Sequence, residues 1–336
     1  MWCCPNCFNN QELRSTVEGI SVDVGNCDYC GSENVKLIDA REIAEQLQPV
    51  INLYEVSSDG LNTIGALLQY DWNLFSLEED KIKDLLEDIF SDTKSINPDL
   101  FNSFVINISI DHQKTKGIIS QWESLKGEII ERNRYFLENV IDFESLEKHL
   151  RDKEKIYRTG ELFYRGRIST KDGLQPTEIG KPPAHKATSG RANPKGIPYL
   201  YVSTDLETTL YETRATFLDY VTVGIFRLTS DIKVVKLIGI DDLSPFEVDL
   251  LEKVLYQPFL KRLEVELSKP LRRFDTELDY LPTQYLCEFI KHIGFDGVAY
   301  GSAMKKNGVN IAIFDDTKIE CIETKVIEIK EILITY

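Results

Sequence analysis

The sequence has no apolar run long enough to cross a lipid bilayer, for which about 20 consecutive apolar residues are needed. Its first residues, Met1-Trp2-Cys3-Cys4-Pro5, also lack the basic and apolar regions of a signal peptide. We therefore expect a cytoplasmic protein without a membrane partner.

Positive charge is scarce along the chain. It carries 39 Lys and Arg residues against 55 Asp and Glu residues, which gives a formal net charge of -16. Because nucleic-acid affinity depends on contacts of Lys and Arg with phosphates, this charge excludes nucleic acid as the main partner. It fits an enzyme with a small-molecule substrate, or a protein with a protein partner.

The composition also lacks the signature of global disorder, since 42% of the residues are hydrophobic and 28% are charged. With 336 residues the chain is longer than one typical domain. The sequence changes character near residues 38 and 157, so we predict three segments, 1–38, 39–157 and 158–336. We place the whole chain in the α+β class.

Five of the seven cysteines lie within the first thirty residues, and disulfides are rare in a reducing compartment. Two C-x-x-C pairs are formed by Cys4, Cys7, Cys27 and Cys30, and each pair makes a turn that aims two thiolates at one point. We predict a small zinc ribbon over residues 1–38. Cys3 could replace Cys4, but only Cys4 gives the usual spacing, and free thiols on a flexible tail are the alternative.

Four cysteine ligands leave no open coordination position, so this zinc ion should be structural and not catalytic. Its expected role is to fold a segment that is too short to stabilise itself.

Apolar residues of segment 39–157 recur at helical spacing, as in Ile82, Leu85 and Ile89, and predict an all-α helical bundle. Some bundles of this type are ribonucleases that carry an Arg and a His close together on one helix. Neither His112 nor His149 has an Arg at the right distance upstream, and we expect both at the surface. The bundle should act as a scaffold, a sensor or a dimerisation element, with a homodimer as the default expectation.

Beyond residue 158 the apolar pattern becomes strand-like and predicts a mixed α/β domain built round a split, largely antiparallel sheet. The expected strands are 161–165, 199–203, 221–228, 233–237, 297–300, 311–314 and 327–336, and the expected helices are 206–217 and 282–293.

Several stretches of this segment are unlike ordinary core sequence. An apolar strand ends in Arg165, which could also be a solvated side chain. A loop rich in Gly and Pro, 189–198, either turns a corner or lets backbone amides approach a phosphate. Helical spacing places Glu212 on one face with Thr208, and Ser302 directly follows a short strand.

Taken in order, these stretches resemble the RES domain, a family named for its Arg, Glu and Ser. The match covers roughly the last half of the chain, and the ribbon and bundle before it resemble the HEPN/RES amino-terminal extensions of some members. The motifs are the strand ending in Arg165, the loop before Leu200-Tyr201, the Thr-rich helix with Glu212, Pro282-Thr283-Gln284, Gly294-Phe295-Asp296-Gly297-Val298-Ala299-Tyr300-Gly301-Ser302, and Asn310-Ile311-Ala312-Ile313-Phe314.

The resemblance implies a fold related to that of ADP-ribosyltransferases, and destruction of NAD by hydrolysis or phosphorolysis, as in toxins of toxin–antitoxin operons. Carried over by position, the catalytic residues are Arg165, Tyr201, Glu212 and Ser302. Arg167 competes with Arg165, and Tyr199 competes with Tyr201 because alternation in a strand puts both on one face. The further candidate NAD contacts are Arg167, Arg191, Asn193, Tyr199, Gln284 and Asn310.

Cleavage of the nicotinamide–ribose bond develops positive charge on the sugar, which the carboxylate of Glu212 would stabilise. Arg165 would bind the pyrophosphate, Tyr201 would offer a flat face to the nicotinamide ring, and the Ser302 hydroxyl would bind ribose or phosphate.

We therefore expect an NAD glycohydrolase or NAD phosphorylase that acts as a toxin or a phage-defence effector. Two alternatives stay open: an ADP-ribosyltransferase that modifies a protein, and a non-catalytic module that senses NAD. An antitoxin or another regulatory protein is the expected partner.

Overall fold

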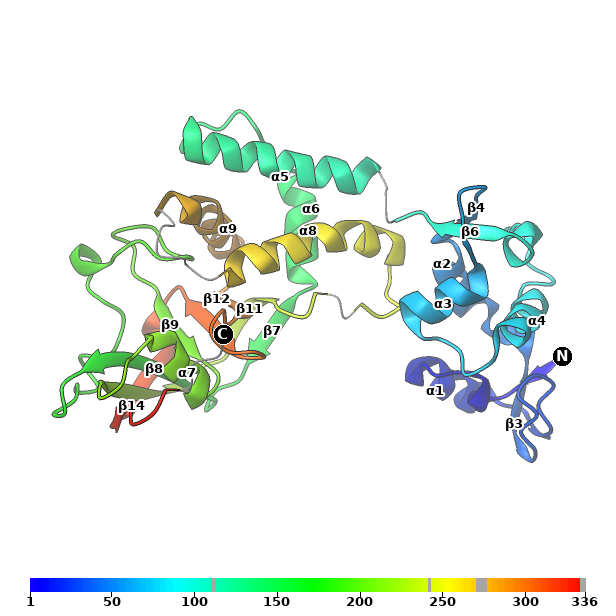
Figure 1. Cartoon of the computed structure of the whole chain (residues 1–336), viewed down its shortest axis with the longest axis horizontal. Helices are drawn as coiled ribbons and strands as arrows, with labels where there is room; N and C mark the ends of the chain where they lie inside the picture. Colours follow the sequence, from blue (N-terminus) through cyan, green and yellow to red (C-terminus); the bar gives the residue numbers. More distant parts are fainter. Residues whose placement is uncertain (110–112, 241–242, 270–276, 333–336) are drawn as a thin grey trace. The chain divides into compact units, whose positions relative to one another are not determined.

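A computed structural model describes residues 1–109, 113–240, 243–269 and 277–332 of the chain (Figure 1). Contacts between residues divide it into two compact units. The first unit comprises Met1–Lys116 and Leu243–Leu255, and the second comprises Gly117–Asp242 and Tyr256–Tyr336. None of the described helices is both long enough and apolar enough to span a membrane.

The first unit begins with a small three-stranded antiparallel sheet in the order β1-β3-β2. Helix α1 (Gln11–Ile20) starts where the side chain of Asn10 accepts a hydrogen bond from the Leu13 amide, and it buries Leu13 and Val17 on one face. The strands are β1 (Trp2–Cys3), β2 (Asp23–Gly25) and β3 (Val35–Asp39).

The expectation of an all-α segment over 39–157 is wrong. A second antiparallel sheet, in the order β4-β6-β5, accompanies the helices of the first unit, and β7 (Glu154–Tyr157) joins the sheet of the second unit. Most of these strands are too short to show a period of two in the sequence. The elements are α2 (Ala44–Ile51), β4 (Tyr54–Val56), β5 (Asn62–Thr63), α3 (Ile64–Trp72), α4 (Glu79–Ile89) and β6 (Phe104–Asn107).

One hydrophobic core serves the whole first unit. It joins the cysteines of the amino-terminal sheet to apolar residues of helices α2, α3 and α4, with Phe8 packed against Phe75 at 5.7 Å between ring centroids. The segment Leu243–Leu255 returns to this core and contributes Leu250 and Val254. The ribbon segment is therefore built into a larger unit.

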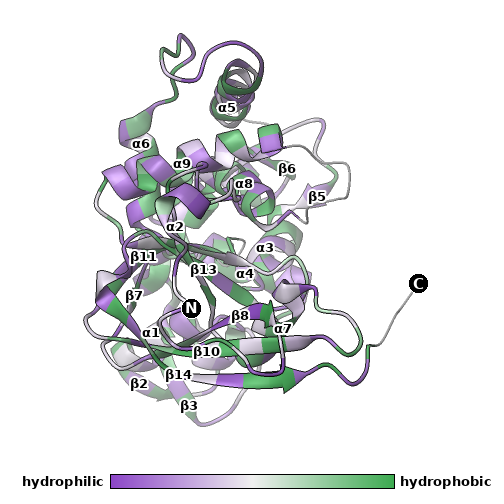
Figure 2. Ribbon diagram, turned by 90° about the vertical axis from the view of Figure 1, so that its left-hand side faces the viewer, coloured by the Kyte–Doolittle hydropathy of each residue, from purple (hydrophilic) through white to green (hydrophobic). Residues whose placement is uncertain are grey.

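The second unit is built on an eight-stranded sheet in the order β14-β10-β8-β9-β13-β12-β11-β7. Among the strand pairs that the structure describes, only β11–β12 is parallel. Hydrophobic and hydrophilic residues follow one another along edge strand β14 (Figure 2). The strands are β8 (Leu162–Ser169), β9 (Leu200–Ser203), β10 (Tyr220–Leu228), β11 (Ile232–Leu237), β12 (Gly297–Gly301), β13 (Val309–Ile313) and β14 (Ile319–Glu328).

Each face of this sheet has its own core, because successive side chains of a strand point to opposite faces. Val235 packs on the side of the helices, whereas its neighbour Val234 packs with Phe163 and Ile311 on the other side. The helices with residues in the first of these cores are α5 (Gln113–Glu131), α6 (Phe143–Arg151), α8 (Leu250–Ser268) and α9 (Leu281–His292).

The sheet is split between β8 and β9, since only Tyr164 and Ser203 pair across these two strands. Helix α7 (Leu206–Thr213) contacts both strands at this point, and the three elements lie together in Figure 1. The split, largely antiparallel sheet that the sequence predicts is therefore present.

Two local expectations are wrong, and one helix was not predicted. The last strand of the described residues is β14, which ends at Glu328, and not 327–336, of which 333–336 lie outside the described residues. His149 is buried, because α6 carries it on the same face as Leu146 and Leu150, and its ring stacks on Tyr256 at 3.9 Å. Helix α8 was not predicted from the sequence. The expectation that His112 is at the surface falls on a residue outside the described ones.

Candidate functional site

A pocket of about 260 Å³ lies where the sheet of the second unit splits. Strands β8 and β9 form two of its walls, α7 forms a third, and β12 and β13 contribute one residue each. The lining residues are Tyr164, Arg165, Gly166, Tyr201, Val202, Ser203, Thr209, Glu212, Thr213, Tyr300 and Asn310.

Helix α7 carries Glu212 to this pocket. The helix starts at Asp205, whose carboxylate accepts hydrogen bonds from the amide and the hydroxyl of Thr208 at 2.8 and 2.7 Å. It can approach β8 closely because Gly166 has no side chain; a Cβ atom there would lie 2.6 Å from a methyl group of Thr213. Local capping and one glycine therefore place the carboxylate.

The carboxylate of Glu212 is held by two side chains from distant parts of the chain. Its Oε1 accepts a hydrogen bond from Ser302 Oγ at 2.6 Å and another from Asn310 Nδ2 at 2.7 Å. The Ser302 turn reaches the start of α7 because Gly308, where a Cβ would lie 2.6 Å from Thr208 Oγ1, leaves room. The tertiary structure thus brings Glu212, Ser302 and Asn310 together.

Arg165 lies in the pocket wall as a cation without a carboxylate partner among the described residues. Its Nε donates to the carbonyl of Ile179 and its Nη1 to the carbonyl of Tyr201, both at 2.9 Å. Burial, together with the nearby charge of Arg167, lowers the pKa of Arg165 to about 10. A negative charge beside Arg165 would offset this effect, so the pocket suits an anionic ligand.

The two alternatives that the sequence left open differ in position. Arg167 does not line the pocket; it is exposed and donates to the carbonyl of Glu178 at 3.0 Å. Tyr199 is buried in the helix-side core, where its hydroxyl donates to Glu288 and its ring packs on Phe314. Arg165 and Tyr201 are therefore the pair at the pocket.

Tyr201 is fixed through its hydroxyl, which donates to Asn193 Oδ1 at 2.7 Å and accepts from the Ala192 amide at 3.2 Å. Burial raises the pKa of Tyr201, so the phenol stays protonated at neutral pH.

The predicted loop 189–198 turns a corner and is held by its own polar side chains. Asn193 is buried and its Nδ2 donates to the carbonyls of Thr188, Pro194 and Ile197. Gln284 donates to the carbonyl of Gly190. Neither residue lines the pocket; both side chains hold the loop that fixes Tyr201, and their contacts with NAD stay a prediction.

Arg191 is also outside the pocket lining. Its Nη1 donates to the carbonyl of Glu266 at 3.2 Å, and its guanidinium lies 5.7 Å from the ring centroid of Tyr280. It therefore connects the loop to helix α8.

Sequence reasoning missed Tyr164, Ser203, Thr209 and Tyr300 in the pocket wall. Tyr300 is buried, and burial raises its pKa. A signal was available for Tyr300, which stands inside the motif that ends at Ser302. Ser203 gave no signal, because a serine at the end of a strand is common.

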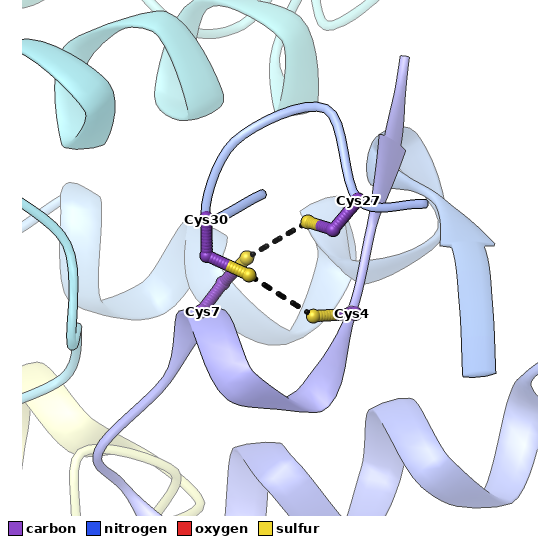
Figure 3. A group of neighbouring side chains, drawn as sticks. All are labelled: Cys4, Cys7, Cys27 and Cys30. Atoms are coloured by element: carbon purple, nitrogen blue, oxygen red, sulfur yellow. Dashed lines mark hydrogen bonds between the residues drawn. The ribbon is translucent and has the colours of Figure 1, made fainter. Parts of the chain in front are cut away.

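A second candidate site lies in the first unit. The sulfur atoms of Cys4, Cys7, Cys27 and Cys30 all lie within 4.8 Å of one another (Figure 3). The Cys4–Cys30 and Cys7–Cys27 sulfur distances are both 3.4 Å, much longer than a disulfide of about 2.05 Å. Tetrahedral zinc at about 2.3 Å from each sulfur sets them roughly 3.8 Å apart, so the cluster fits the metal.

Cys3, the alternative ligand, is outside this cluster among the described residues and is buried in β1. The cluster therefore contains Cys4, as the C-x-x-C spacing predicted, and its four cysteines could hold a metal ion.

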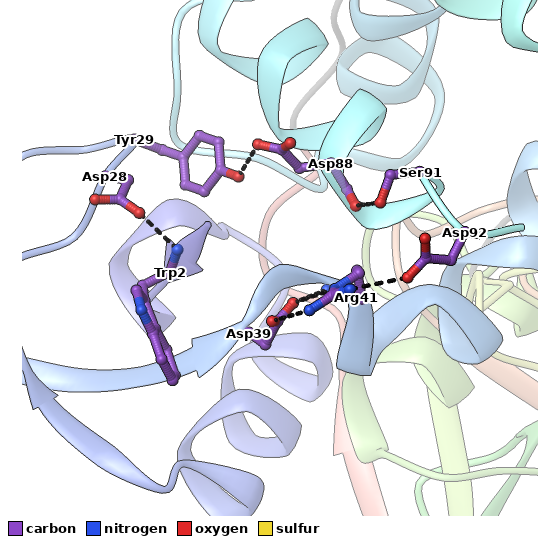
Figure 4. A network of polar contacts seen from close by, with 8 residues as sticks. All are labelled: Trp2, Asp28, Tyr29, Asp39, Arg41, Asp88, Ser91 and Asp92. Atoms are coloured by element: carbon purple, nitrogen blue, oxygen red, sulfur yellow. Dashed lines mark hydrogen bonds and ion pairs between the residues drawn. The ribbon is translucent and has the colours of Figure 1, made fainter.

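The turn that carries Cys27 and Cys30 is tied to helix α4 (Figure 4). The Tyr29 hydroxyl donates to Asp88 Oδ2 at 2.5 Å. Nearby, Arg41 pairs with Asp39 at 2.7 Å and with Asp92 at 2.9 Å. The Tyr29–Asp88 bond therefore joins the cysteine turn to α4, and the Arg41–Asp92 pair joins the turn after β3 to the segment after α4.

The sequence of the second unit decides the family. The family model described as "RES domain" matches residues 165–332, which is half of the chain. The chain belongs to the RES family. No curated protein matches the sequence.

Among solved structures, a chain of the crystal structure of the M. tuberculosis MbcT-MbcA toxin-antitoxin complex is similar to this chain. The two share 12% sequence identity with a TM-score of 0.32, and the match covers 56% of this chain and 93% of that one.

The match to the RES domain begins at Arg165 itself and includes Tyr201, Glu212 and Asn310 in the pocket, with Ser302 beside it. The RES domain of this chain therefore presents, in one small pocket, a fixed carboxylate and a guanidinium that has no carboxylate partner among the described residues. Such a pair can bind an anionic ligand and stabilise positive charge that develops next to the carboxylate.

Proposed function

We propose that this protein cleaves the nicotinamide–ribose bond of NAD. The observation that carries the proposal is the pocket at the sheet split, where the held carboxylate of Glu212 and the half-buried cation of Arg165 line the same space. Its volume of about 260 Å³ is just below the roughly 300–1,000 Å³ of sites for larger ligands. It therefore suits the nicotinamide–ribose end, with the rest of NAD extending outward.

Cleavage of the nicotinamide–ribose bond needs a carboxylate but no general acid to protonate the leaving group. The ring nitrogen of NAD is already positive, so nicotinamide leaves as a neutral molecule with the electron pair of the broken bond. Positive charge then builds on the ribose, where the Glu212 carboxylate stabilises it. Water or phosphate adds to the same carbon, and water would pass its proton to the carboxylate.

Two further residues of the pocket support this assignment. Arg165 contributes the planar donor group that suits the pyrophosphate. Tyr201 is held by two hydrogen bonds of its hydroxyl, which leaves its ring as a flat apolar face for nicotinamide.

The test is incubation of the purified protein with NAD and measurement of free nicotinamide. Wild-type protein should release it, and Glu212→Ala should abolish release, while Glu323→Ala, an exposed acid on edge strand β14, should not. Equal release by Glu212→Ala would remove the mechanism.

The products identify the acceptor. ADP-ribose indicates hydrolysis, ADP-ribose phosphate indicates phosphorolysis, and label that stays covalently on protein indicates an ADP-ribosyltransferase. Tight NAD binding without any product would indicate a sensor.

The biological role that follows is depletion of NAD, as a toxin or a phage-defence effector. An antitoxin or another regulatory protein would then hold the activity in check. Co-expression with a protein encoded beside this one should relieve growth arrest if that protein is the antitoxin.

The cysteine cluster is proposed as a structural zinc site. Four thiolates complete a tetrahedral shell and leave no position for a substrate, and the cluster is part of the core of the first unit. A zinc content of about one ion per chain by elemental analysis, lost in Cys7→Ser, is the expected result.

A further inference from the structure

We infer that Ser203, a buried residue outside the motifs of the sequence, is a positioning residue that aims Glu212 through the amide of Asn310. The inference rests on the proposed function, because it assigns the carboxylate oxygen that faces the sugar. It is built from three hydrogen bonds that join β9, β13, α7 and the Ser302 turn.

The Ser302 hydroxyl has no capacity left for a ligand. It has one proton and two lone pairs. The proton goes to Glu212 Oε1, and the lone pairs accept from the amides of Met304 and Lys305, both at 3.1 Å. Ser302 therefore holds the carboxylate, and the direct contact with ribose or phosphate expected from the sequence would require these bonds to break.

The orientation of Asn310 follows from the chemistry of its neighbours. A carboxylate only accepts hydrogen bonds, so the amide must turn its NH₂ group toward Glu212. The carbonyl oxygen Oδ1 must then point the other way, where Ser203 Oγ donates to it at 2.7 Å. Ser203 and Asn310 are direct partners in the β9–β13 register, so the backbone itself sets this contact.

Both donors bind the same oxygen of Glu212. Ser302 and Asn310 donate to Oε1, and no described residue donates to Oε2. Oε2 is therefore the oxygen available to the developing positive charge of the sugar. A carboxylate fixed through one oxygen and free at the other needs no reorganisation in the reaction.

Without the Ser203 hydroxyl, the buried Oδ1 of Asn310 would lose its donor. The amide would then be held by its bond to Glu212 alone and could shift in position, which loosens one of the two bonds that aim Glu212.

The experiment is a double-mutant cycle on nicotinamide release. Ser203→Ala should lower kcat about tenfold with KM within about twofold, and Asn310→Ala should lower kcat further. If Ser203 acts through Asn310, Ser203→Ala should cause no additional loss in the Asn310→Ala background. Ser203→Thr, which keeps the hydroxyl on a strand, should restore most of the activity.

The matched control is Ser169→Ala, which removes a hydroxyl bonded to Thr222 on β8 and β10, outside the pocket lining. Its kcat should equal that of the wild type.

Unchanged kcat in Ser203→Ala, or a loss that multiplies with that of Asn310→Ala, would overturn this inference alone while the proposed function stands. A wild-type protein that binds NAD and releases no nicotinamide would overturn both. If Ser203→Ala fails to fold, Ser203→Cys, with a weak donor in the same place, should show the same reduced kcat at unchanged KM.

Discussion

The two units of this protein reach a fixed structure by different means. In the first unit the described strands are two to five residues long, and the cysteine cluster sits inside the core. In the second unit β10 and β14 pair over nine and ten residues, and helices cover one face of the sheet. The long sheet is stabilised by its own strand pairing, and we propose that a metal ion stabilises the unit with the short strands.

The difference extends to the position of polar groups. The first unit places its thiols within the core, where four of them form one cluster that could hold a metal ion. The second unit gathers its polar side chains where strand pairing stops, between Tyr164 and Ser203. A break in a sheet leaves space beside backbone that is rigid on both sides, which suits a pocket for chemistry.

Removal of the metal should have the largest effect, and it should affect one unit only. Structural zinc in small domains contributes roughly 10–16 kcal/mol to folding. A strong chelator, or Cys7→Ser, should therefore remove the amide hydrogen-exchange protection of residues 1–109 and leave β8 to β13 protected. Cys321→Ser on β14 is the control and should leave both units unchanged. Equal loss of protection in the two units would show that the metal does not stabilise the first unit separately from the second.

Arg165→Lys tests the second unit at its pocket. Lysine cannot bond two carbonyls and still offer a planar pair of donors to a pyrophosphate, so KM for NAD should rise about 10- to 100-fold. Arg167→Lys, which changes an exposed arginine with one carbonyl bond, should alter KM less than about threefold. An equal rise in KM for both variants would show that both arginines bind the anion, contrary to the assignment of Arg165 alone.

Tyr29→Phe should have the smallest effect, and it tests how much one hydrogen bond beside the cysteine cluster stabilises the first unit. It removes the hydrogen bond from the cysteine turn to Asp88 while the zinc ligands stay, and should lower the free energy of unfolding of that unit by about 1 kcal/mol. Tyr70→Phe, on an exposed tyrosine of α3, should change it by less than about 0.5 kcal/mol. A zinc content below that of the wild type would contradict the structural reading of Tyr29.

The sequence predicted the elements with clear periodicity or sharp ends. Six of the expected strands of the second unit correspond to β8 to β13, and the expected helices correspond to α7 and α9, where Asp205 and Pro282 mark the starts. Helix α8 was missed because Pro258 lies inside it and its apolar residues face more than one side. The short strands β4 to β6 were missed because two to four residues show no period.

The candidate site was predicted in part for the same reason. Motif spacing indicated Arg165, Tyr201, Glu212 and Ser302, and it also indicated Asn193 and Gln284, whose side chains hold a loop. Ser203 and Tyr164 could not be found, because their place in the pocket depends on which strands stand side by side at the split.

The sequence by itself determined the cysteine spacing, the acidic charge and the order of the RES motifs, because these are properties of neighbouring residues or of composition. Tertiary structure alone decided that Ser302 and Asn310, 90 and 98 residues from Glu212 along the chain, bind the same carboxylate oxygen. Hydrogen bonds act over about 3 Å, and contacts at that distance are set by strand register and helix packing, which no local pattern encodes.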